Sequence, residues 1–124
     1  MMDRVFISAA ALLGLSGVAL SAYTSHGLAD DALRSVAASA VLQQMLHALA
    51  LLALGVWIRA EGIASKLHMA AGGFFIAGCV VFSGFIYLRV FGVTDALRGF
   101  VPAGGVFLML GWLFLGLAAW RRKA

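Results

Sequence analysis

Long apolar stretches alternate with short polar segments along this chain. Four stretches are each about 20 residues long, at about 5–23, 36–58, 67–90 and 100–120. A helix needs roughly 20 apolar residues to cross the ~30 Å hydrocarbon core of a bilayer. The stretches do not show the strict alternation of apolar and polar residues that is typical of a membrane β-strand. The pattern therefore predicts four transmembrane helices, forming a single transmembrane domain over residues 1–124.

The polar segments between these stretches are short. They run from about Thr24 to Ser35, from Arg59 to Lys66 and from Phe91 to Gly99. Short connections favour antiparallel neighbours. We therefore expect an all-α fold, an integral membrane four-helix bundle with up-down-up-down topology.

The first apolar stretch has some features of a signal peptide. It follows Arg4 and ends near the small residues Ala19, Ser21 and Ala22. The apolar run is nevertheless long for a signal sequence. We therefore expect it to be a true membrane span.

Composition supports a membrane location. The chain is 64% hydrophobic with a mean hydropathy of +1.04, whereas an ordinary soluble domain is about half apolar. A soluble protein of 124 residues would have too little interior for so much apolar surface. The net charge of +4 comes from residues at segment ends, so it indicates contact with anionic lipid head groups rather than with nucleic acid. Membrane lipid is thus the expected partner.

The distribution of Lys and Arg predicts the orientation, because cytoplasmic segments carry an excess of both. One side, with the N-terminus, the second connection and the C-terminus, carries six of them, namely Arg4, Arg59, Lys66, Arg121, Arg122 and Lys123. The other side carries three, namely Arg34, Arg89 and Arg98. We therefore expect both termini in the cytoplasm.

Small residues recur along three of the spans. They are Ala10, Gly14, Gly17 and Ser21 in the first span, Gly73, Ala77 and Gly84 in the third, and Gly104, Gly105, Gly111 and Gly116 in the fourth. Small residues let helices approach closely in lipid. We favour packing between the helices of one chain, with contact to a second copy or a membrane protein partner as the alternative.

Six polar or titratable residues lie at membrane depth with helical spacing. They are Ser39, Gln43 and His47 in the second span and Cys79, Ser83 and Tyr87 in the third. Residues equidistant from the connection between these spans should lie at equal depth. The predicted pairs are Ser39 with Tyr87, Gln43 with Ser83, and His47 with Cys79, and together they would form a polar seam.

The polar seam has two interpretations. Buried polar groups need partners because lipid supplies no water, so the seam could simply hold the two helices in register. We favour this interpretation. The alternative is a proton path or a polar pocket for a lipid head group or a quinone, with His47 as the titratable member. The neighbouring Gln44 should face the first or the fourth span instead.

Other candidates for chemistry are weak. His26, His47 and His68 should lie at three different depths, so they disfavour a metal or haem site, and we expect no cofactor. His26 and Arg89 lie near the outer ends of spans, where Arg89 is expected to snorkel or to pair with a nearby aspartate. No Asp or Glu lies deep in a span, which argues against an ion-coupled transporter. No nucleophile, phosphate-binding or paired-carboxylate motif is apparent.

Several motifs along the chain carry a family resemblance. They are Ser25-His26-Gly27-Leu28, the segment from Gln44 to Leu52, Phe82-Ser83-Gly84 with Tyr87, Pro102-Ala103-Gly104-Gly105 and Gly111-Trp112-Leu113. With these motifs the chain resembles domain of unknown function family 423, to which the transmembrane protein 256 group of animals looks related. It departs from the family at 20–25, usually Gly-Ala-Phe-Gly-Ala, and at Gln43, often an aromatic. The resemblance implies four helices in a bacterial inner membrane and no particular activity.

The sequence therefore leads to two expectations about function. The first is a small non-catalytic membrane protein that is an accessory or structural component of a membrane complex. The alternative is a protein that binds lipid, quinone or protons at an interior polar site around His47.

Overall fold

The computed structural model describes residues 1–121, and over that range it contains helices and no strand. Arg122 and Lys123, which contributed to the predicted orientation, lie outside the described residues. The helices are α1 (Met2–Gly27), α2 (Asp31–Glu61), α3 (Lys66–Cys79), the π-helical turn η1 (Val80–Gly84), α4 (Phe85–Val90), the 3₁₀ turn η2 (Arg98–Phe100) and α5 (Val101–Trp120). Since α3, η1 and α4 follow one another without a break, residues 1–121 form four long apolar helices, as predicted.

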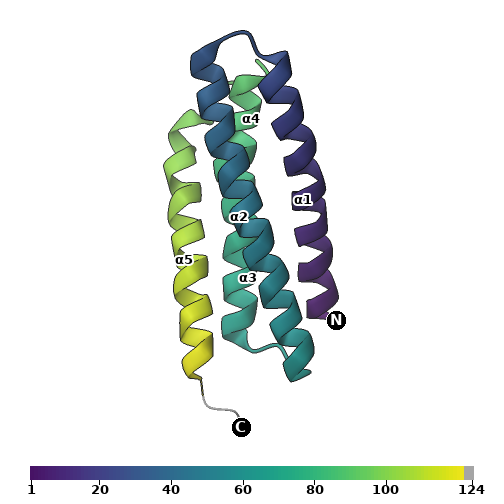
Figure 1. The fold of residues 1–124 in the computed structure, drawn as a ribbon. Coiled ribbons are helices and arrows are strands. Elements are labelled where there is room, and N and C mark those ends of the chain that lie inside the picture. Colours follow the sequence, from purple (N-terminus) through teal and green to yellow (C-terminus); the bar gives the residue numbers. More distant parts are fainter. Residues whose placement is uncertain (122–124) are drawn as a thin grey trace.

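The four helices are arranged as an antiparallel bundle (Figure 1). α2 packs along α1 and against the third span, and α5 packs along α3 and η1. Figure 1 shows α1 and α5 at opposite sides of the bundle, with α2 and α3 between them. α2 and the third span therefore form the centre of the molecule, where the predicted polar residues lie.

Local chemistry explains where the helices begin and end. The Asp30 carboxylate accepts hydrogen bonds from the backbone N–H groups of Ala32 (2.8 Å) and Leu33 (3.2 Å), so it caps α2. Ser65 and His68 cap α3 through reciprocal bonds of 3.2 Å. α2 ends at Glu61 and is followed by Gly62, whose φ of 74° is costly for residues with a Cβ.

Glycines bring the helices into close contact. A Cβ on Gly104 would lie 2.8 Å from the backbone Cα of Phe82 in η1, and one on Gly111 would lie 2.5 Å from the ring of Phe75. These glycines therefore pack the helices of one chain against each other, which was the favoured interpretation. Other glycines in the spans would place a Cβ in open space, among them Gly14, Gly73, Gly84 and Gly116.

Candidate functional site

Gln44 lies at the centre of the hydrogen-bond network inside the bundle. Its side chain is only 3% exposed. The amide nitrogen donates to the Leu13 carbonyl (2.8 Å) and to the Ser16 hydroxyl (2.9 Å) of α1. The amide oxygen accepts from the Tyr87 hydroxyl (2.7 Å) of α4. One carboxamide thus uses both of its protons and its oxygen to join α2 to the first and third spans, and the prediction that Gln44 faces the first or the fourth span is confirmed for the first.

Ser83 makes a second link between α2 and the third span. Its hydroxyl is buried and donates to the Ala40 carbonyl at 2.7 Å. Ser83 lies within η1, where the backbone hydrogen bonds join residues five apart instead of four, so the turn is wider than an α-helical turn. The neighbouring residue Phe82 packs against Gly104 of α5. The π-helical turn therefore presents adjacent residues to two different helices.

His47 makes a third link, between α2 and α5. Its Nδ1 lies 2.6 Å from the Gln43 carbonyl oxygen, which can only accept, so Nδ1 carries the ring proton. Its Nε2 accepts a hydrogen bond from the indole N–H of Trp112 at 3.0 Å. The imidazole is 5% exposed and also packs against Phe75. Both ring nitrogens of His47 are therefore engaged within the protein.

The pairs predicted for the polar seam are wrong in detail. Tyr87 bonds to Gln44 instead of Ser39, Ser83 bonds to Ala40 instead of Gln43, and His47 bonds to Trp112 instead of Cys79. The first difference arises because helical side chains lean toward the N-terminus of their own helix. In antiparallel helices two long side chains converge from different depths, so equal backbone depth does not select the partners.

The remaining seam residues make no side-chain hydrogen bond within the described part of the chain. Ser39 is exposed on the outside of α2, and Cys79 is a buried free cysteine. Gln43 is half-buried and, with His47 and Trp112, lines a groove of about 420 Å³ between α2 and α5. The structure thus separates the six residues into bonded and unbonded groups, and a ligand-binding or proton-carrying role for them stays a prediction.

The two outer-end candidates lie near connections. Arg89 is 3.6 Å from Asp95, which confirms one of the pairings expected for it. His26 is exposed near the end of α1 and lines a hollow between α1 and α2. Neither residue contacts the hydrogen-bond network at the centre.

Sequence reasoning missed Trp112 and Ser16. Trp112 could have been identified because it lies in the middle of a span, whereas Trp57 and Trp120 lie near span ends. An indole N–H at membrane depth needs an acceptor. Ser16 gave no such signal, because its hydroxyl can donate to a carbonyl of its own helix, as it does to that of Leu12 at 2.8 Å.

The other end of the bundle contains a second polar group of residues. Glu61 accepts from the Trp57 indole at 3.0 Å and pairs with Arg121, the residue directly after α5. His68 is fully buried, and its ring packs edge-to-face against the indole of Trp57, with ring centroids 4.5 Å apart. Among residues 1–121, no three His, Cys, Asp or Glu side chains are grouped so that they could hold a metal ion. These contacts tie the ends of α2, α3 and α5 together.

Comparisons with known proteins agree with this architecture. The family described as a protein of unknown function (DUF423) matches residues 20–105. The chain is 35% identical over 121 residues to a UPF0382 membrane protein of Staphylococcus aureus, covering 95% of this chain and 97% of that protein. It is 28% identical to a UPF0382 membrane protein of Haemophilus influenzae, covering 99% of both chains, and 32% identical to one of Bacillus subtilis, covering 94% and 96%. No solved structure matches the chain.

The resemblance drawn from the sequence motifs is confirmed by these matches. Four helices of this chain are long and apolar enough to cross a membrane, and the relatives are named membrane proteins. The chain therefore belongs to the DUF423 family and is an integral membrane protein.

Proposed function

We propose that this protein is a small non-catalytic component of the bacterial inner membrane, accessory to a larger membrane complex. The observation that carries the proposal is that Gln44 and His47, the polar side chains at the centre, use their hydrogen-bonding capacity within the chain. A catalytic acid, base or metal ligand needs a free atom that can reach a substrate. Groups engaged in this way serve to fix the helices.

The outer helices support an accessory role. In an apolar stretch of 18 residues within α1, only 17% is buried inside the chain, and the same share holds for the fourth span. The corresponding share for α2 is 50%. These helices offer apolar surface to lipid or to a partner helix, and the described chain has no domain outside the bundle. Helical spans favour the inner membrane of a bacterium over the outer membrane, whose spanning proteins are barrels.

Purification in a mild detergent tests the accessory role. A tagged copy expressed at its natural level should be recovered with a stoichiometric membrane protein partner, which native mass spectrometry would weigh. Recovery of an isolated monomer, or of a homo-oligomer alone, would contradict the proposal. Topology is tested separately, because the predicted cytoplasmic C-terminus should make a fused green fluorescent protein fluoresce and a fused alkaline phosphatase inactive.

A second candidate function is a ligand site in the groove between α2 and α5. The observation in its favour is the Gln43 carboxamide, which has no hydrogen-bond partner among residues 1–121 although it lies near the middle of α2. An unpaired amide at that depth is costly, so a carbonyl-bearing ligand such as a quinone or a lipid would satisfy it. Binding of a short-chain quinone should then be lost in Gln43→Leu and His47→Ala, and unchanged binding in both variants would exclude this candidate.

A further inference from the structure

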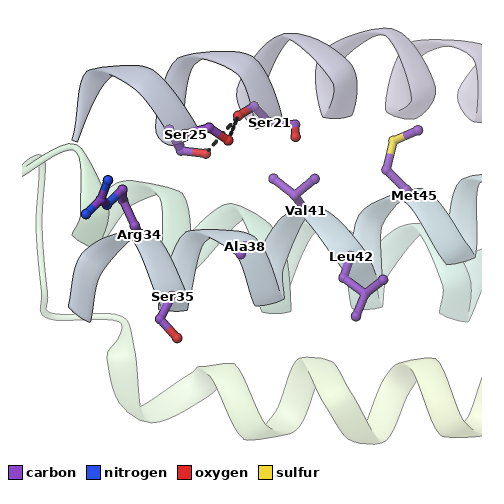
Figure 2. A pocket seen from close by; sticks show the side chains of 9 residues that line it. Ser21, Ser25, Arg34, Ser35, Ala38, Val41, Leu42 and Met45 are labelled. Atoms are coloured by element: carbon purple, nitrogen blue, oxygen red, sulfur yellow. Dashed lines mark hydrogen bonds between the residues drawn. The ribbon is translucent and has the colours of Figure 1, made fainter. Parts of the chain in front are cut away.

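A groove of about 570 Å³ lies between α1 and α2 near the connection that joins them (Figure 2). Ser21 and Ser25 of α1 line one wall, and Arg34, Val41 and Met45 of α2 line the other. A second hollow of about 410 Å³ shares the two serines, Val41 and Met45 with it and continues toward the middle of α1. The two hollows therefore lie next to each other along the outer face of α1 and α2.

Polarity in this groove is ordered by depth. α2 has 31 residues and is therefore about 46 Å long, some 16 Å more than the hydrocarbon core. Roughly five residues at each end should lie among the lipid head groups. Arg34 then lies at head-group depth, while Val41 and Met45 lie in the hydrocarbon. Figure 2 shows this order, with Arg34 at one end of the groove and Met45 at the other.

The polar end of the groove offers one cation, Arg34, and free hydroxyl groups, and the carboxylate that pairs with this cation lies beside the groove, outside its lining. Arg34 forms an ion pair with Asp31, and the two side chains are 43% and 89% exposed, so both remain accessible. Ser25 donates to the Ser21 carbonyl at 2.6 Å. The hydroxyls of Ser21 and Ser35 make no hydrogen bond within residues 1–121, so their protons are available to an acceptor.

We propose that this groove binds one phospholipid with a zwitterionic, ammonium-bearing head group, such as phosphatidylethanolamine. The phosphate lies against the Arg34 guanidinium and the ammonium against the Asp31 carboxylate. The Ser21 hydroxyl donates to an ester carbonyl, and an acyl chain follows Val41 and Met45. An anionic head group would meet the carboxylates of Asp30 and Asp31, and a choline head group has no N–H to donate.

Native mass spectrometry of the full chain tests this proposal with three probes that share the same acyl chains: phosphatidylethanolamine, phosphatidylglycerol and phosphatidylcholine. We expect one phosphatidylethanolamine to be retained in preference to the other two lipids. Arg34→Gln should reduce that retention by roughly threefold or more, as for the loss of one exposed ion pair. Asp31→Asn should shift the preference toward phosphatidylglycerol, because it removes the anion and leaves the arginine.

Two further variants separate lipid binding from a change in folding. Arg98 and Asp95 form a similarly spaced exposed pair outside the groove, so Arg98→Gln is a matched control that should leave lipid retention unchanged. Ala38 is an exposed residue that lines the groove, so Ala38→Phe should fill it and displace the lipid while the charges remain. Equal retention of the three lipids by the natural protein, or equal losses in Arg34→Gln and Arg98→Gln, would overturn the proposal.

Discussion

Replacing Gln44 by Met should destabilise the bundle, whereas the same change at the adjacent Gln43 should not. Methionine has nearly the size and shape of glutamine but cannot replace its hydrogen bonds. Gln44→Met removes the bonds to Leu13, Ser16 and Tyr87 and leaves the hydroxyl of the half-buried Tyr87 without its acceptor. Gln43→Met removes no side-chain hydrogen bond within residues 1–121.

The structure sets the size of this difference. Interhelical hydrogen bonds in membrane proteins contribute about 0.6 kcal/mol each on average. Three such bonds amount to about 2 kcal/mol for Gln44→Met. Gln43→Met should not lower the free energy of unfolding, because it removes no side-chain hydrogen bond among the described residues and replaces an unpaired amide by an apolar side chain.

Unfolding in mixed detergent micelles, with the denaturing detergent fraction as the variable, would measure both values. Tyr87→Phe closes a double-mutant cycle with Gln44→Met, and the coupling energy should be about 0.6 kcal/mol. Equal effects of the two Met substitutions, or a coupling energy of zero, would refute the assignment of Gln44 as the centre of the network.

Three further substitutions test other parts of the bundle. Gly104→Ala should lower the free energy of unfolding by about 1–3 kcal/mol, because the added Cβ would meet the backbone of η1. Gly116→Ala places its Cβ in open space, so it should be neutral or slightly stabilising. Equal unfolding curves for the two variants would contradict this packing. Trp112→Phe should cost about 0.6 kcal/mol or more, because His47 Nε2 loses its donor, and an unchanged stability would argue against that bond. Asp95→Asn should lower the free energy of unfolding by less than about 0.5 kcal/mol at low salt and not at all at high salt, because its ion pairs are largely exposed. A larger loss of stability that persists at high salt would contradict this.

The four spans could be predicted from the sequence because each gives a strong local signal. About 20 apolar residues without a charge specify a membrane helix independently of the rest of the chain. The helices extend beyond the apolar spans: α2 starts at Asp31, five residues before the apolar stretch that begins at about 36, because Asp30 caps the helix there.

The partners within the network depend on geometry that spacing alone does not provide. The π-helical turn at Val80–Gly84 changes which face each later residue of the third span presents. The lean of long side chains then lets Tyr87 reach Gln44 instead of Ser39. Periodicity therefore predicted polar contacts between the second and third spans, but neither the atoms that meet nor the bond from Trp112 of the fourth span to His47.

The nitrogen chemical shifts of His47, measured by NMR on the labelled protein in lipid bilayers, test most directly the claim that the side chains of Gln44 and His47 are engaged within the chain. The account predicts a neutral ring with its proton on Nδ1, directed at the Gln43 carbonyl, and an Nε2 that shows coupling to the Trp112 indole N–H. A proton on Nε2, or an Nε2 with no coupling to Trp112, would contradict the account and leave a free nitrogen in the groove that a ligand could use.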